Sequence, residues 1–261
     1  MSVLQALLLG IIQGLTEFLP VSSSGHLEIG HALLGIEGHG HLLFATVVHG
    51  ATVLSTVVVF RKDLASLFSG LFRFRWNDET RYVIYLLISV VPILLLGILF
   101  RENVENLFTG NLFFVGIMLL ITATLLAFTQ FIKSKEQKIK LPDAFIIGIA
   151  QALAVMPGIS RSGSTIATGL LLGKKKDEVA RFSFLMVLLP IIGVNLLDLF
   201  SGKIAGDESS VGIPVLIAGF IAAFVSGLLA CSWMIRIVKK GKLIYFSVYC
   251  LIIGLIAIFA A

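Results

Sequence analysis

Residues 13–26 read Gln-Gly-Leu-Thr-Glu-Phe-Leu-Pro-Val-Ser-Ser-Ser-Gly-His, and residues 157–165 read Pro-Gly-Ile-Ser-Arg-Ser-Gly-Ser-Thr. In both stretches Pro, Gly and Ser interrupt a long apolar segment, 3–36 in the first case and 143–172 in the second. These residue types end helices. Each half of the two segments has roughly 10–17 residues, which is too short to cross a bilayer. We therefore predict two re-entrant hairpins, each made of two helices that enter and leave the membrane on one side.

The chain as a whole is too apolar for a water-soluble protein. Of its 261 residues, 57% are hydrophobic and 13% are charged, whereas about 25% of the residues of a soluble domain are charged. The mean hydropathy is +1.02. This composition excludes a soluble enzyme, a nucleic-acid-binding module and a disordered protein. We expect an all-α integral membrane protein that forms a single transmembrane domain over residues 1–261.

Six further apolar segments are long enough to cross a bilayer: 41–60, 82–100, 111–132, 182–200, 213–235 and 243–260. If the first hairpin opens to the outside, nearly all of the 20 Lys and Arg residues fall on the opposite side. This bias predicts a multi-pass protein of the cell (inner) membrane with cytoplasmic basic loops. The same bias explains the net charge of +5, because the excess Lys and Arg residues set the orientation in the membrane. No nucleic-acid partner is therefore expected.

The two hairpins are related by an internal repeat. A shift of 138 positions aligns Gln13 with Gln151, Ser22 with Ser160 and Gly25 with Gly163. Three predicted spans separate the hairpins, so the second copy is inverted, and the halves cover about 1–135 and 136–261. In such an architecture the broken segments meet near the bilayer midplane. Helix N-termini then point inward, where they attract anions.

Glu17 and Arg161 are charged residues at these two breaks. A charge at the bilayer centre costs roughly 2.5–3.5 kcal/mol on insertion scales, so we expect both residues to be functional or paired. The planar fork of Arg161 suits phosphate oxygens. Gln13 and Glu17 share a helix face and offer oxygen ligands for a hard divalent cation. The alternative is that Glu17 and Arg161 form a structural ion pair between the hairpins.

Hydroxyl and N–H groups around these charges predict a site for phosphate chemistry. The candidate phosphate-binding residues come from both breaks: Ser22, Ser24, Ser160, Ser162, Gly163 and Thr165. Either His26 or Ser23 could attack phosphorus, and the residues themselves leave both open. The alternative for His26 is a hydrogen-bonded histidine of the core.

These motifs resemble those of the undecaprenyl-diphosphate phosphatases of the bacitracin-resistance type. The first signature of that family is [E/Q]xxxE followed by a Pro-Val-Ser-Ser-x-Gly-His turn, here Gln13 to Glu17 and Pro20 to His26. The second is PGxSRSxxT, which residues 157–165 match without exception. The resemblance covers essentially the whole chain.

The resemblance implies hydrolysis of undecaprenyl or another polyprenyl diphosphate to the monophosphate and inorganic phosphate. This reaction recycles the lipid carrier for cell-wall or glycan synthesis and confers resistance to bacitracin, which competes by sequestering the lipid. The implied site opens to the outer, periplasmic face. The oligomeric state stays open, with a homodimer as one alternative.

The resemblance also implies roles for individual residues. Glu17 would hold Mg²⁺ or Ca²⁺ together with Gln13, although a glutamine at position 13 removes one anionic ligand. Arg161 would clamp the diphosphate with the help of Ser160, Ser162 and Thr165. Either His26 or Ser23 would be the nucleophile, with the other in a supporting proton-transfer role.

A polyprenyl-phosphate flippase or anion transporter on the same scaffold is the main alternative. Inverted repeats with broken helices are typical of transporters. In that case Glu17 and Arg161 would bind and release an anionic substrate without reacting with it.

Overall fold

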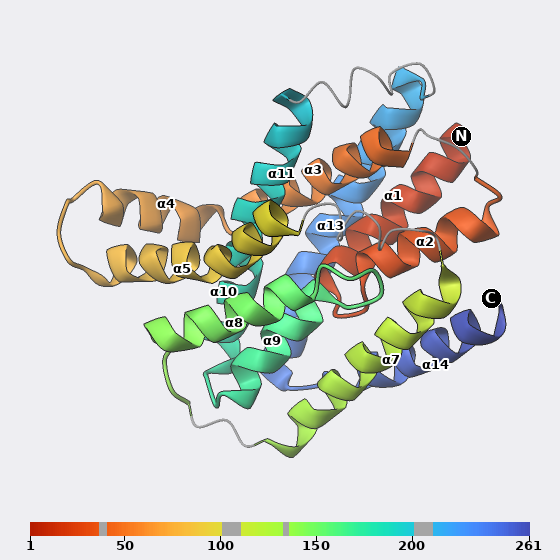
Figure 1. The fold of residues 1–261 in the computed structure, drawn as a ribbon. Helices are drawn as coiled ribbons and strands as arrows, with labels where there is room; N and C mark the ends of the chain where they lie inside the picture. The colour runs from red at the N-terminus through yellow and green to blue at the C-terminus, as the bar shows by residue number, and fades with distance from the viewer. Residues whose placement is uncertain (37–40, 101–110, 133–135, 201–210) are drawn as a thin grey trace.

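The computed structural model describes residues 1–36, 41–100, 111–132, 136–200 and 211–261. The regular secondary structure of this part is helical, apart from one isolated β-bridge between Gln137 and Lys174, and Figure 1 shows most of the helices gathered into one bundle. The predicted all-α class is confirmed. The described elements are α1 Val3–Phe18, α2 Ser23–Leu33, α3 His41–Val59, α4 Arg61–Leu71, α5 Asp78–Leu99, α7 Leu112–Phe128, η1 Thr129–Phe131, α8 Leu141–Leu153, α9 Arg161–Leu171, α10 Lys176–Met186, α11 Leu188–Phe200, α13 Ile213–Lys240 and α14 Ile244–Phe259.

Both predicted breaks are present, between α1 and α2 and between α8 and α9. The second helix of each pair begins at a serine cap, because Ser22 Oγ accepts from the Gly25 N–H at 3.3 Å and Ser160 Oγ accepts from the Gly163 N–H at 3.0 Å. Such side-chain acceptors satisfy the free N–H groups of a first helical turn. α9 begins and ends 138 residues after α2, which is the predicted repeat distance. The re-entrant course of the two pairs stays a prediction.

The second break is held in place by α7. Thr122 Oγ1 donates to the Gly158 carbonyl at 3.2 Å and accepts from the Ser160 N–H at 3.0 Å. Gly158 has φ +98°, and a Cβ atom there would lie 2.5 Å from the Val115 carbonyl oxygen. Only glycine combines this backbone conformation with so close an approach. The start of α9 is therefore fixed against α7.

The protein is a multi-pass membrane protein with several apolar spans. In the described part of the chain three helices are long and apolar enough to cross a bilayer: α5, Leu112–Phe131 and α13. α3 and α4 pass the same test together, but they meet at a bend of 74°. α14 is also apolar, although it has only 16 residues.

Within the predicted span 182–200 the helix is interrupted at Val187, between α10 and α11, and the crossing itself stays a prediction. Pro190 gives the physical reason. A helix that continued through Pro190 would lose one backbone hydrogen bond, and the proline ring would clash with the carbonyl four residues earlier. That carbonyl belongs to Met186, the last residue of α10.

Helices of one predicted half pack against helices of the other. α1 lies along α13, α8 lies along α5, and α7 lies along α14. The α1–α13 contact is close at Gly14, where a Cβ atom would lie 2.0 Å from Ser226 Oγ and 2.5 Å from the Ala223 carbonyl oxygen. Small residues let helix backbones approach in this way. The packing fixes the end of α1, which carries Glu17.

We predict that Gly14→Ala destabilises the α1–α13 contact. The added methyl group has no space, and overpacking of this kind costs about 1–3 kcal/mol. The midpoint of thermal unfolding in detergent should fall. Gly97→Ala is the matched control, because a Cβ atom at Gly97 on α5 meets nothing within 4 Å. Equal midpoints for the two variants would contradict the proposed contact.

Candidate active site

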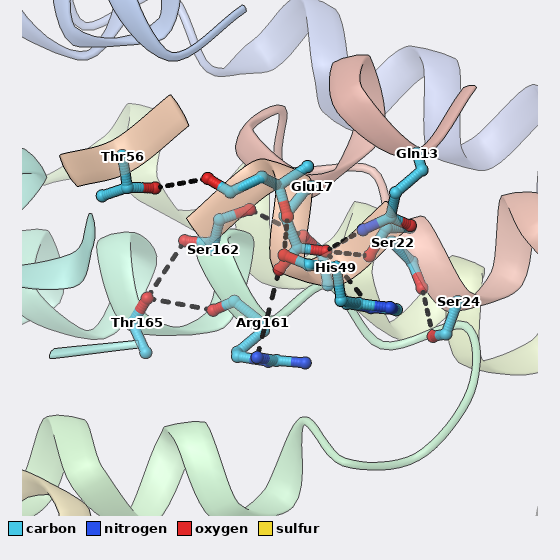
Figure 2. A network of polar contacts seen from close by, with 12 residues as sticks. Gln13, Glu17, Ser22, Ser24, His49, Thr56, Arg161, Ser162 and Thr165 are labelled. Carbon is cyan, nitrogen blue, oxygen red and sulfur yellow. Dashed lines mark hydrogen bonds and ion pairs between the residues drawn. The ribbon is translucent and has the colours of Figure 1, made fainter. Parts of the chain in front are cut away.

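The side chain of Glu17, in the last turn of α1, is the centre of a polar cluster (Figure 2). It is only 8% exposed. Ser23 Oγ donates to Glu17 Oε2 at 2.7 Å, and Gln13 Nε2 donates to the same oxygen at 2.9 Å. Arg161 Nη1 lies 4.0 Å from Glu17 Oε1. The structure therefore brings four of the predicted site residues together from α1, α2 and α9.

The starts of α2 and α9 face this cluster with their serine caps. Ser23 and Arg161 are the first residues of the two helices, and Ser162 Oγ donates to the Leu19 carbonyl at 3.1 Å, which links one break to the other. Ser22 has φ +71°. Left-handed backbone at a residue other than glycine costs on the order of 1–3 kcal/mol and is concentrated at functional sites. Two helix N-termini directed at one place favour an anion.

Other predicted phosphate-binding residues lie in the same two turns. Ser24 Oγ is 3.4 Å from Ser22 Oγ, and Ser160 Oγ is 3.3 Å from Ser162 Oγ. Gly163 takes part through its N–H, which Ser160 caps. These hydroxyls are already paired with each other, so a phosphate would have to exchange these contacts for its own.

A small cavity opens beside Arg161. It is lined by Glu17, Arg161, Ser162 and Thr165 and by three hydroxyl residues outside the motifs, Thr52, Thr56 and Ser183. Its volume is about 20 Å³, which is room for about one water molecule. The described part of the chain gives the Arg161 guanidinium no hydrogen bond, and its side chain is 30% exposed. Its donors are therefore available to an anionic ligand.

His26 does not join the cluster. Its Nδ1 lies 2.8 Å from the Ser22 carbonyl oxygen, which can only accept, so Nδ1 donates. In a neutral ring Nε2 then accepts from the hydroxyl of Tyr249 on α14, 2.8 Å away. The two rings are also stacked, with centroids 5.6 Å apart. Among the described residues, His26 has no hydrogen bond or ion pair with Glu17 or Arg161, and its predicted role as a nucleophile stays a prediction.

His49, on α3, approaches Glu17 although no sequence motif includes it. Its Nε2 lies 3.7 Å from Glu17 Oε2, and its Nδ1 donates to the Ala45 carbonyl at 2.8 Å. One sequence signal could have identified His49: an ionisable residue within an apolar span is functional by default. Tyr249 and Ser183 carry no comparable signal, because tyrosine and serine are common in membrane helices.

The donor set around Glu17 fits a hard divalent cation only in part. The described residues include no group of three His, Cys, Asp or Glu side chains that could hold a metal ion. Glu17 supplies one carboxylate, and Gln13 Oε1 is buried without a hydrogen-bond partner in the described part of the chain. One carboxylate and one amide oxygen suit a cation such as Mg²⁺ or Ca²⁺ that shares its ligand shell with substrate phosphates and water. They do not suit a cation held by protein groups alone.

Comparison with known proteins gives matches over nearly the whole chain. The family model described as "Bacitracin resistance protein BacA" matches residues 6–256. The undecaprenyl-diphosphatase of Parabacteroides distasonis is 58% identical over 261 residues, covering 99% of this chain and 98% of its own. That of Bacteroides thetaiotaomicron is 59% identical over 262 residues, with the same coverage. That of Methanobrevibacter smithii is 36% identical over 272 residues, covering 98% of this chain and 96% of its own.

Proposed function

Because the chain belongs to the family of the bacitracin resistance protein BacA, we propose that it is an undecaprenyl-diphosphatase. It hydrolyses undecaprenyl diphosphate to undecaprenyl monophosphate and inorganic phosphate, which returns the lipid carrier to use and confers resistance to bacitracin. The observation that carries this proposal is the cluster in which Glu17, Ser23 and Arg161 meet at the starts of two broken helix pairs. The cluster combines the carboxylate of Glu17 as a base, the hydroxyl of Ser23 and the guanidinium of Arg161, which are the groups that phosphate transfer needs.

The proposed membrane arrangement has two re-entrant hairpins, α1–α2 and α8–α9, in an inverted repeat of halves 1–135 and 136–261. The pairing of α1 with α13 and of α8 with α5 supports it, because the shift of 138 positions places α1 on α8 and α5 on α13, so the two pairs are equivalent contacts between opposite halves. The basic loops lie in the cytoplasm and the site opens to the outer face. The isoprenoid tail stays between helices in the lipid, and the diphosphate reaches the cluster from the side.

We assign the attack to Ser23 rather than His26. The 2.7 Å contact between Ser23 Oγ and Glu17 Oε2 is a nucleophile–base pair, whereas the two ring nitrogens of His26 are engaged by the Ser22 carbonyl and the Tyr249 hydroxyl. Ser23 Oγ bonds to the terminal phosphorus and its proton passes to Glu17. The bond from that phosphorus to the bridging oxygen breaks, and undecaprenyl monophosphate leaves. Water then hydrolyses the phosphoserine and releases inorganic phosphate.

Arg161 holds the phosphate oxygens and stabilises the charge that develops on them. Its fork can grip two oxygens at once, and the poorly hydrated surroundings strengthen the interaction. Glu17 and Gln13 would hold Mg²⁺ or Ca²⁺ with the substrate, and a cation held there would add charge neutralisation at the diphosphate. Hydroxyl and N–H groups at the two helix starts surround the phosphate. They belong to Ser22, Ser24, Ser160, Ser162, Gly163 and Thr165.

Release of phosphate from a soluble short-chain prenyl diphosphate by the purified chain in detergent tests the proposal. A flippase or anion transporter on the same scaffold would bind the compound without releasing phosphate. Metal-dependent release supports the enzyme, and its absence at every Mg²⁺ and Ca²⁺ concentration would favour transport.

We predict that Ser23→Ala lowers kcat on the order of 10³-fold or more, as expected for loss of a nucleophile. His26→Ala should cause a much smaller loss. Brief reaction with a prenyl diphosphate labelled in its terminal phosphate, followed by acid quenching and peptide mapping, should place the label on Ser23. A label on His26, or full activity of Ser23→Ala, would reverse the assignment.

We predict that Glu17→Gln lowers kcat about 10²–10⁴-fold, because the amide cannot accept the serine proton. The residual activity should no longer respond to EDTA or to added Mg²⁺, since the one carboxylate of the cluster is gone. Glu28→Gln is the matched control on α2 and should keep the metal response. Unchanged EDTA sensitivity of Glu17→Gln would contradict the metal role of Glu17.

We predict that Arg161→Lys lowers kcat/KM about 10²–10³-fold, although the positive charge is kept. A lysine is a point charge that cannot grip two oxygens in a plane, and losing one preorganised contact to developing charge has this effect. Steady-state phosphate release measures it. Near-normal turnover would mean that charge alone is needed at position 161.

A further inference from the structure

The turn between α4 and α5 exposes three large aromatic side chains. Residues 72–76 read Phe-Arg-Phe-Arg-Trp, and Phe72, Phe74 and Trp76 are 70%, 89% and 72% exposed. The next outward side chains of α4 continue the apolar surface, with Phe68 60% exposed. We refer to residues 72–76 as the aromatic tip. It lies outside the proposed active site, and the phosphatase reaction makes no use of it.

The aromatic tip is held in one conformation by its own hydrogen bonds. Asn77 Nδ2 donates to the Gly70 carbonyl at 2.9 Å, and Thr80 Oγ1 donates to the Arg75 carbonyl at 3.0 Å. Phe74 has φ +49°, a left-handed conformation that is rare for a bulky residue. Such a conformation persists only where the surroundings enforce it. The tip is thus a preformed surface.

Its position along the chain places the tip at a membrane boundary. Trp76 lies two residues before Asp78, where α5, one of the apolar spans, begins. α4 packs back along the start of α5, with Gly70 against Glu79. Figure 1 shows α4 and the first part of α5 extending away from the other helices. Chain that directly precedes a span lies at the headgroup level, where tryptophan is enriched.

Two arginines alternate with the aromatic residues. The guanidinium groups of Arg73 and Arg75 have no acidic partner among the described residues, whereas Arg81 is paired with Asp78. Arg61 and Lys62 add exposed positive charge at the other end of α4. Basic side chains at the surface of a bilayer attract anionic lipid headgroups. The charge of the tip therefore complements phosphate groups at the depth where its rings lie.

We propose that the aromatic tip binds the anionic phospholipids of the membrane in which the chain is embedded. Phe72, Phe74 and Trp76 insert among the headgroups and upper acyl chains, and Arg73 and Arg75 pair with lipid phosphates. This binding site fixes the α4–α5 pair at the surface on the side of the basic loops. It is independent of the phosphatase reaction.

Trp76 is a direct probe of this site, because the chain has two tryptophans and Trp233→Phe leaves Trp76 as the sole one. The full chain with Trp233→Phe is placed in phosphatidylcholine nanodiscs with a minor fraction of lipid brominated near the headgroup. The brominated lipid is either phosphatidylglycerol or phosphatidylcholine. We expect both to quench Trp76, with phosphatidylglycerol severalfold more effective at equal mole fraction. Raising the NaCl concentration to 1 M should remove the difference.

Two double variants separate charge from ring insertion. Arg73→Gln with Arg75→Gln should abolish the preference for phosphatidylglycerol and keep the quenching by phosphatidylcholine. Lys239→Gln with Lys240→Gln, exposed at the end of α13, should keep the preference. Equal quenching by the two brominated lipids in the parent chain at low salt would overturn the proposal, whether or not the variants fold. Quenching of Trp76 by aqueous iodide and not by either lipid would also overturn it and would point to a soluble partner.

Discussion

A buried carboxylate is tolerated only where nearby groups replace the water that it has lost, and Glu17 imposes this requirement on the fold. Its partners come from separate helices: Gln13 from α1, Ser23 from α2, His49 from α3 and Arg161 from α9. The ends of these helices must therefore meet at one place inside an apolar bundle. Close packing of α1 on α13 at glycine positions brings the end of α1 to that place.

Breaking both helix pairs makes such a meeting possible. A continuous helix has no free N–H groups in its middle, whereas a break creates a new N-terminus with unsatisfied donors. Here two such N-termini, each capped by a serine, lie next to one carboxylate. The arrangement attracts an anion without needing many charged side chains, which would be costly inside a bilayer.

The repeat supplies matching backbones and different chemistry. A shift of 138 positions places Arg161 on Ser23 and Val155 on Glu17. Each half contributes a capped helix start, but the first adds the hydroxyl and the carboxylate and the second adds the guanidinium. A phosphoanhydride needs both kinds of group, an acceptor for the nucleophile's proton and a donor for the phosphate oxygens. A symmetric pair of identical turns would offer only one kind.

The sequence by itself determined the features that depend on local physics. Apolar length and low charge gave the helical membrane class, and the Pro, Gly and Ser runs gave the two breaks with their serine caps. The cost of intramembrane charge singled out Glu17 and Arg161. The break at Val187 also has a local cause, the Pro190 ring. The apolar residues on both sides of Pro190 nevertheless continue the hydrophobic pattern of a single span, so the pattern did not predict the break.

Only the tertiary structure decided which side chains meet across helices that are far apart in the chain. It turned His26 toward Tyr249, 223 residues away, and it brought His49 of α3 to Glu17 of α1. Helical periodicity specifies the face of a helix on which a residue lies. It does not specify the helix that packs against that face, because association inside a bilayer depends on close packing and interhelical hydrogen bonds of many residues at once.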